Sequence, residues 1–302
     1  MIPNRSSPNV EPIEFTTVEA AVGDAIQRRS TASLRLLGHG EVSLVMAWPT
    51  SDPVAALKRV PPFRDAARAQ QYVEACEQFF SVLSSADVAV WPTSLHTIFR
   101  HDGRAVVYHC QPIADVTRLG TNVLRSTEPV DDHPLLLAIA DATSRVCAPT
   151  IGFDVQMANW LWDGTTSTQI DFTSPFLLVD ERNELVYDSQ VFLDEYPYVV
   201  RRYLKHELTT IVQRFTSPEG ALSDLVANLL KEGLGNWVDP ALSTFNRRLG
   251  LDLQRGAVRK MFEADAKLFP VVLRLKKGQR WWLTHTGRRY EQLLPEKTTY
   301  ER

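Results

Sequence analysis

Short blocks of apolar residues, broken by turn-forming sequences, occupy the first third of the chain. A Pro-Pro pair at residues 61–62 ends one block because proline offers no N–H to a strand ladder. Another pair of blocks flanks an Asp-Gly sequence that favours a hairpin. The pattern predicts a small sheet with strands within residues 34–48, 53–60, 94–100 and 105–110.

Helical spacing begins at residue 65 and dominates the rest of the chain. Residues 65–85 carry four apolar side chains at steps of four, three and four, which place them on one helix face. These side chains are Tyr72, Cys76, Phe79 and Leu83. Further helices are predicted at residues 17–29, 134–147, 194–215, 222–230 and 255–268. Strands that come first and helices that follow indicate an α+β fold.

Three polar side chains stand at a fixed spacing in the middle of the chain: Asp154, Asn159 and Asp171. Two short apolar strands lie between Asn159 and Asp171, and the Asp163-Gly164 pair between them favours a hairpin turn. Such a hairpin would bring Asn159 and Asp171 to the same end of a small sheet. Phosphoryl transfer from ATP needs this set, in which one Asp orients or deprotonates the acceptor hydroxyl and an Asn and a second Asp hold Mg²⁺.

The same residues resemble the catalytic motifs of the protein-kinase-like superfamily, in particular its small-molecule branch, which includes the aminoglycoside phosphotransferases. Asp154 and Asn159 match the catalytic-loop pattern, and residues 171–173 match the Asp-Phe-Gly motif. As a whole, the chain is similar to a group of bacterial kinase-like proteins. The resemblance implies a bilobal fold with a small N-terminal sheet lobe that carries one main helix, and a larger, mainly helical C-terminal lobe.

The upstream part of the kinase signature is present in the right order. Gly38, Gly40 and Ser43 follow the glycine-rich loop that closes over phosphates, with Ser43 in place of the third glycine. Lys58 ends the next apolar block, where kinases have their phosphate-binding lysine, and it is the only lysine in the first 204 residues. Its ammonium could bridge phosphate oxygens and a carboxylate in a confined site. The alternative is a surface lysine at a strand end.

The resemblance implies further nucleotide contacts. In kinases a glutamate of the main helix pairs with the strand lysine, and Glu77 is the first choice here, with Glu74 as the alternative. Either residue could instead belong to an exposed acidic helix face. Gln111 and Ile113 fall between the predicted lobes, where backbone groups would bind adenine, and Asp115 is a candidate partner of the ribose.

The chain departs from the family at two positions beside Asp154. Gly152 stands where the family has a histidine, and Gln156 stands where it has a lysine or histidine close to the transferred phosphate. A neutral amide donates a hydrogen bond but supplies no full charge to the transition state. We expect Gln156 to take part in catalysis while the missing charge comes from His39, from a guanidinium of the C-terminal part, or from the substrate.

The C-terminal part differs in charge from the rest of the chain. Residues 247–289 contain 12 Arg or Lys and 3 acids, so the remaining 21 cations and 33 acids carry a net charge of −12. This part could be a basic, aromatic surface for an acidic substrate, a peptide or a nucleic acid. The favoured interpretation is a cationic face packed on an acidic lobe with Trp281 or Trp282 buried, because no nucleic-acid motif accompanies the charge.

Composition is compatible with one bilobal enzyme, since 302 residues with 44% hydrophobic content can bury a sizeable core. The 3 cysteines lack metal or redox spacing, and no apolar run is long enough to span a membrane. We therefore expect a cytoplasmic protein. The use of 25 Arg against 8 Lys indicates a high-GC bacterial source.

We predict an N-terminal arm with a short helix at residues 1–33, a sheet lobe at 34–110 and a helical lobe at 111–302. The predicted function is ATP- and Mg²⁺-dependent transfer of phosphate to a hydroxyl of a small molecule. The expected partners are a nucleotide and an acceptor, without a membrane or a nucleic acid. The alternatives are a Ser/Thr kinase for a ribosomally made peptide and a nucleotide-binding pseudokinase that acts as a partner protein. The lack of an Ala-Pro-Glu motif after Asp171 disfavours a regulated protein kinase.

Overall fold

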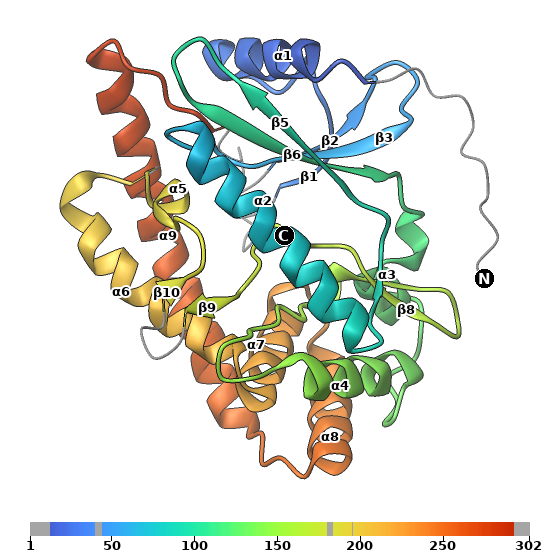
Figure 1. The fold of residues 1–302 in the computed structure, drawn as a ribbon. Coiled ribbons are helices and arrows are strands. Elements are labelled where there is room, and N and C mark those ends of the chain that lie inside the picture. The colour runs from blue at the N-terminus through green and yellow to red at the C-terminus, as the bar shows by residue number, and fades with distance from the viewer. Residues whose placement is uncertain (1–12, 40–43, 180–183, 195, 293–302) are drawn as a thin grey trace.

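The computed structural model describes residues 13–39, 44–179, 184–194 and 196–292, and it has two lobes (Figure 1). An antiparallel sheet with two long helices forms the N-terminal lobe, and helices make up most of the C-terminal lobe. The predicted α+β class, with a small sheet lobe and a larger helical lobe, is confirmed. Among the described residues, none of the helices combines the length and hydrophobicity that crossing a membrane requires.

Five antiparallel strands form the main sheet in the order β1-β2-β3-β6-β5. The strands are β1 (Arg35–His39), β2 (Leu44–Trp48), β3 (Ala55–Arg59), β5 (Ser94–Phe99) and β6 (Ala105–Pro112). The central strand β3 places Lys58 opposite Val45 of β2 and His109 of β6. The hairpin predicted in this lobe is confirmed, since β5 and β6 pair around a turn in which Gly103 has a φ of 80°.

Each face of the sheet is covered by one helix (Figure 1). On one face, α1 (Phe15–Arg28) packs against Val106 and Tyr108 of β6. On the other face, α2 (Ala66–Ser85) packs against Ala105 and Val107 of the same strand. Alternate residues of β6 thus point to opposite, equally buried faces, which explains why this strand is an uninterrupted apolar run in the sequence.

A large apolar core fills the C-terminal lobe around α7 (Pro218–Lys231). This helix begins at Ser217, whose hydroxyl accepts a hydrogen bond from the Gly220 N–H at 3.1 Å. The other helices of the lobe are α3 (Gly120–Arg125), α4 (Pro134–Val146), α5 (Gln190–Leu193), α6 (Tyr198–Phe215), α8 (Val238–Leu249) and α9 (Arg255–His285). Short elements complete the fold: β4 (Ala89–Val90), β9 (Leu178–Val179), β10 (Glu184–Leu185), η1 (Val116–Arg118) and η3 (Gly235–Trp237).

Three predicted helices have different bounds in the structure, and one of them, expected from residue 222, begins earlier as α7 at Pro218. The helix expected from residue 194 begins as α6 at Tyr198, with Pro197 at its N-cap. The helix expected to end at residue 268 continues as α9 to His285, although Pro270 lies inside it. Packing of the segment beyond the proline, where Leu273 is buried at 8% exposure, compensates for the hydrogen bond that Pro270 cannot donate.

The basic C-terminal part was expected to bury Trp281 or Trp282, and this expectation is wrong. The two indoles are 62% and 46% exposed on α9. The buried polar side chains of this stretch are instead Lys276 and Gln279, at 8% and 5% exposure. Packing on the lobe therefore uses the polar side of the helix as well as its apolar positions.

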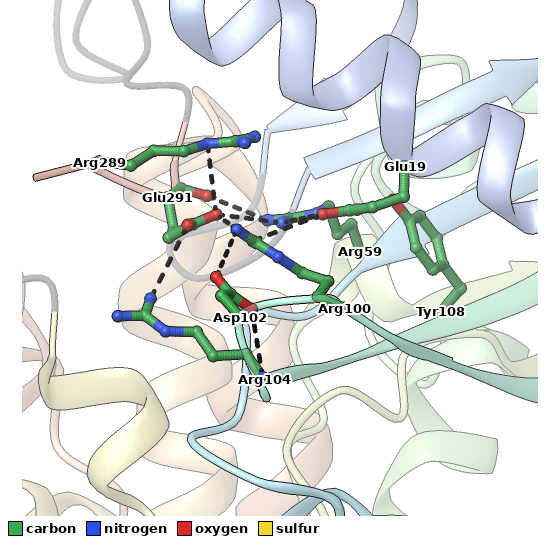
Figure 2. A network of polar contacts seen from close by, with 8 residues as sticks. All are labelled: Glu19, Arg59, Arg100, Asp102, Arg104, Tyr108, Arg289 and Glu291. Carbon is green, nitrogen blue, oxygen red and sulfur yellow. Dashed lines mark hydrogen bonds and ion pairs between the residues drawn. The ribbon is translucent and has the colours of Figure 1, made fainter.

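After α9 the chain returns to the sheet lobe and places Glu291 among several arginines (Figure 2). Arg100 lies 2.9 Å from the Glu291 carboxylate, and Arg59 donates to the Glu291 carbonyl at 3.0 Å. Arg59 also pairs with Glu19 of α1 at 2.8 Å. Burial would lower the pKa of Arg59, but the carboxylates of Glu19 and Glu291 raise it above its usual value. This network ties α1, the sheet and the end of α9 together.

Candidate active site

Lys58 and Asp171 form an ion pair where the two lobes meet. Lys58 lies on β3 of the sheet lobe, and Asp171 follows β8 (Ser167–Gln169) of the helical lobe. The Lys58 Nζ lies 2.6 Å from the Asp171 Oδ2. Burial would raise the pKa of Asp171, but the Lys58 ammonium and two hydrogen bonds from Thr173 lower it to about 2. Asp171 is therefore a carboxylate at any physiological pH.

The hairpin predicted around Asp163 and Gly164 is confirmed, and it explains how Asn159 comes close to Asp171. β7 (Trp160–Trp162) pairs antiparallel with β8 around a turn in which Gly164 has a φ of 98°. At the open end of the hairpin, the N–H of Ile170 donates to the Asn159 carbonyl at 2.9 Å. Asn159, in η2 (Met157–Asn159), and Asp171 are thus held at one end of the small sheet.

Asp154 lies beside this pair and has the opposite electrostatic environment. One oxygen of its half-buried carboxyl accepts a hydrogen bond from the Gln156 N–H at 3.1 Å, and the carboxyl also bonds the Asn159 side chain. Burial and then the negative charges of Asp224 and Asp171 raise the pKa of Asp154 to about 7. The structure therefore brings Lys58, Asp154, Asn159 and Asp171 together, with two carboxyl groups whose pKa values differ widely.

Asp224 is a residue of this site that the sequence analysis missed. It lies on α7 at 5% exposure, and its carboxylate accepts hydrogen bonds from Gln156 at 3.4 Å and from Arg214 at 3.2 Å. The amide of Gln156 is therefore directed at a carboxylate. An acid in the mostly apolar run of residues 221–230 was the available signal, because a charged residue is rarely buried without a partner.

The prediction that Glu77 or Glu74 pairs with Lys58 is wrong. Both carboxylates are exposed on α2, and among the described residues the ion pair of Lys58 is with Asp171. The helix docks on the sheet through the face that contains Tyr72 and Cys76, both fully buried. Since successive helical residues turn by about 100°, positions 74 and 77 point away from that face. Among the described residues, α2 therefore contributes no carboxylate to the site.

Tyr72 is a second residue that the sequence analysis did not assign to the site. The buried face of α2 places its hydroxyl next to β6, which pairs with the strand of Lys58, and next to the loop that follows Asp171. The hydroxyl lies 2.8 Å from His109 Nε2 and donates to the Thr173 carbonyl at 2.9 Å. No feature of the sequence distinguishes this tyrosine from an ordinary core aromatic.

The predicted nucleotide-binding residues lie in different parts of the sheet lobe. Gly38 lies on β1 beside an irregularity in the pairing with β2, whereas Gly40 and Ser43 lie outside the described residues. Gln111 on β6 donates to the Ile170 carbonyl at 2.9 Å, which connects this strand to the segment before Asp171. Ile113 follows β6 and is 39% exposed.

Two other residues of the segment between the lobes have local partners. Asp115 caps η1 by accepting from the Thr117 N–H at 2.9 Å. The Pro112 carbonyl accepts from the Trp91 indole at 2.9 Å. Backbone groups beyond Pro112 are therefore the better candidates to hydrogen-bond the adenine base of a nucleotide in this segment.

Comparison with protein families gives a match over residues 17–280, which is most of the chain. The chain belongs to the family described as "Family of unknown function (DUF6206)". Among solved structures, this DUF6206 protein is similar to the one titled "WaaP in complex with acyl carrier protein". The two share 13% sequence identity with a TM-score of 0.39, and the match covers 89% of this chain and 98% of that chain. No curated protein matches the chain.

The donor atoms of this DUF6206 site are those that Mg²⁺ prefers. The Asp171 carboxylate and the Asn159 amide supply hard oxygen ligands, and the Asp171 side chain is 32% exposed, so an ion can reach it. The described residues contain no group of three or more His, Cys, Asp or Glu that could hold a metal without a further ligand. One or two protein oxygens together with phosphate oxygens are the usual coordination of Mg²⁺ in phosphoryl-transfer sites. The residues therefore fit a metal that arrives with a nucleotide.

Proposed function

We propose that this protein is an ATP- and Mg²⁺-dependent phosphotransferase that acts on a hydroxyl of a small molecule. The observation that supports the proposal is the interlobe ion pair of Lys58 with Asp171, next to a second carboxyl group, Asp154, with the opposite pKa shift. When the surroundings shift the pKa values of two neighbouring acids in opposite directions, the two acids can take separate roles in one reaction. A merely structural ion pair would not require the second acid.

Lys58 and Asp171 are assigned to the nucleotide. MgATP, when bound, would supply the phosphoryl group, and its Mg²⁺ would offset part of the negative charge that develops on the phosphate oxygens. The Lys58 ammonium would bind phosphate oxygens, while Asp171 and Asn159 would hold Mg²⁺ through their side-chain oxygens. Asp171 remains ionised for this task because its pKa is lowered to about 2.

Asp154 is assigned to the acceptor hydroxyl. A pKa of about 7 lets its carboxylate accept a proton from the acceptor at neutral pH, and the Gln156 N–H orients one of its oxygens. Gln156 adds a hydrogen-bond donor but no charge, and its side chain is held by Asp224 at 3.4 Å. The cation that kinases place here must then come from another residue or from the acceptor, which would favour cationic acceptors.

A small-molecule acceptor is favoured over a peptide because the segment after Asp171 is short. Only six residues separate Asp171 from β9 at Leu178–Val179, which is little room for the ordered segment on which regulated protein kinases bind a peptide.

Nucleotide binding by variants of the two acids tests the proposal. Asp171→Asn should remove the Mg²⁺ dependence of ATP binding measured by calorimetry, because it replaces a charged ligand of the ion. Asp154→Asn should leave that binding within about twofold of the parent and abolish ATP turnover, since its role is with the acceptor. Asp52→Asn, at an exposed turn of the sheet lobe, is the matched control. ATP binding that ignores both Mg²⁺ and Asp171 would contradict the proposal and favour a pseudokinase.

A further inference from the structure

A continuous path of hydrogen bonds leads from α2 to Lys58. The Tyr72 hydroxyl donates to the Thr173 carbonyl at 2.9 Å. The backbone N–H and the hydroxyl of Thr173 both donate to Asp171 Oδ1, at 3.0 and 2.7 Å. The other oxygen of this carboxylate, Oδ2, lies 2.6 Å from Lys58 Nζ. The hydrogen bonds of Thr173 thereby fix the orientation of the Asp171 carboxylate, so that Oδ2 faces Lys58 and is available to a metal ion.

His109 makes the second attachment of Tyr72. It stands opposite Lys58 in the pairing of β3 with β6, and its Nε2 lies 2.8 Å from the Tyr72 oxygen. Tyr72 has one hydroxyl proton, which goes to the Thr173 carbonyl, so the Nε2–H of a neutral His109 must donate to the Tyr72 oxygen. Burial and the nearby Lys58 lower the pKa of His109 to about 3, in agreement with a neutral ring.

Burial makes this connection stiff. Tyr72 and His109 are 0% and 1% exposed, and Thr173 is 5% exposed, so water does not compete for their hydrogen bonds. The same face of α2 also holds Phe172, whose ring meets that of Phe80 edge-on at 5.0 Å. A displacement of α2 would therefore move the loop that carries Asp171.

We infer that Tyr72 is a positioning residue. It holds α2 against the Lys58–Asp171 ion pair, the role that the sequence analysis expected of a glutamate on this helix. It connects α2 to Lys58 through Thr173 and Asp171, and it connects both to the sheet through His109. The inference rests on the proposed function, since the positioned groups are those assigned to MgATP. Loss of the hydroxyl would leave the Thr173 carbonyl and the His109 Nε2–H buried without their partner and would loosen the orientation of Asp171.

The chain offers a matched control for the loss of a buried tyrosine hydroxyl. The Tyr187 ring meets that of Tyr72 edge-on at 5.3 Å and is 3% exposed, but its hydroxyl has no hydrogen-bond partner among the described residues. Tyr187→Phe therefore removes an oxygen from the same cluster without breaking the path. Tyr72→Phe removes an oxygen and two hydrogen bonds.

Two measurements separate the inference from the proposed function. The first is calorimetric affinity for a non-hydrolysable ATP analogue with and without Mg²⁺. Tyr72→Phe should weaken Mg²⁺-dependent binding roughly tenfold, about the effect of one lost buried hydrogen bond, and should leave Mg²⁺-free binding within about twofold. The second is the rate at which an acylating reagent modifies Lys58 in the nucleotide-free protein, followed by mass spectrometry. This rate should rise in Tyr72→Phe because the ion pair that shields Lys58 is less well ordered.

Equal behaviour of Tyr72→Phe and Tyr187→Phe in both measurements would overturn the inference. A parent protein that binds no nucleotide would instead overturn the proposed function, and the acylation rates would still decide whether Tyr72 orders the ion pair. If Tyr72→Phe does not fold, Thr173→Val breaks the next step of the path, and the same two changes are expected from it.

Discussion

Replacing Asp154 by Asn should stabilise the protein at neutral and alkaline pH. The folded chain holds Asp154 with a pKa of about 7, whereas the unfolded chain has the usual value of 3.8. The folded state therefore binds the proton more tightly, and the contribution of this group to stability falls as pH rises from about 4 to about 7. Above that range the carboxylate is ionised in both states and destabilises the fold by its full amount. Asn carries no charge and can still accept the hydrogen bond from the Gln156 N–H.

The size of the effect follows from the pKa difference. From 3.8 to about 7 is roughly three units at about 1.4 kcal/mol each, which gives an upper bound near 4 kcal/mol. Part of the raised pKa comes from repulsion by Asp224 and Asp171, so it belongs to the group of carboxylates and not to Asp154 alone, and the Asp154 carboxyl is only half-buried. We therefore expect the free energy of unfolding to increase by roughly 2 kcal/mol at pH 8. The gain should shrink steadily as the pH is lowered to 5.

Urea unfolding of the parent and of Asp154→Asn at several pH values between 5 and 8 measures this difference. Asp163→Asn is the control, because hydrogen bonds from the Thr166 and Thr165 backbone lower the pKa of Asp163 to about 2. Because the pKa of Asp163 is lowered on folding, its contribution to stability is constant above about pH 5, so the control difference should be flat over the same range. A flat difference for Asp154→Asn as well would refute the argument that Asp154 is held by the fold in a costly environment.

Two further predictions concern turnover and the C-terminal network. Because the base must be ionised, kcat/KM for ATP turnover should rise about tenfold per pH unit below pH 7 and level off above it; a pH-independent rate between 5 and 8 would remove Asp154 from that role. Glu291→Ala should destabilise the fold by roughly 3 kcal/mol in urea unfolding, because it leaves the buried Arg59 and the half-buried Arg100 without one partner. Arg104→Ala, at a side chain that is 45% exposed, should cost less than about 1 kcal/mol, and the reverse order would contradict the network.

Local signals in the sequence predicted the parts of the site that one segment builds by itself. The Asp163-Gly164 turn and its flanking apolar residues specify a hairpin, and the hairpin alone brings Asn159 near Asp171. Lys58 was placed with these residues by the resemblance of its apolar block to the lysine-bearing strand of kinases, and it is the only lysine in the first 204 residues. The two-lobed order of strands and helices was predictable for the same reason, since periodicity is a local property.

Partners chosen by packing between distant segments could not be predicted in this way. Glu77 occurs at a plausible spacing from Lys58, but the rotation of α2 about its axis is set by how Tyr72 and Cys76 fill the sheet face. Asp224 comes to Gln156 only because α7 runs through the centre of the lobe. The contact of Glu291 with Arg59 likewise joins two segments that are 232 residues apart in the sequence, and no local pattern predicts it.

The coordination of a paramagnetic ion tests the central claim most directly. Mn²⁺ is a spectroscopic substitute for Mg²⁺, and its electron paramagnetic resonance signal distinguishes bound from free ion. The protein should bind Mn²⁺ tightly only together with an ATP analogue, as two protein oxygens from Asp171 and Asn159 are too few by themselves. Asp171→Asn should abolish this nucleotide-dependent signal, and Asp154→Asn should preserve it. Tight Mn²⁺ binding that needs no nucleotide, or a nucleotide-dependent signal that persists in Asp171→Asn, would contradict the assignment of this site to MgATP.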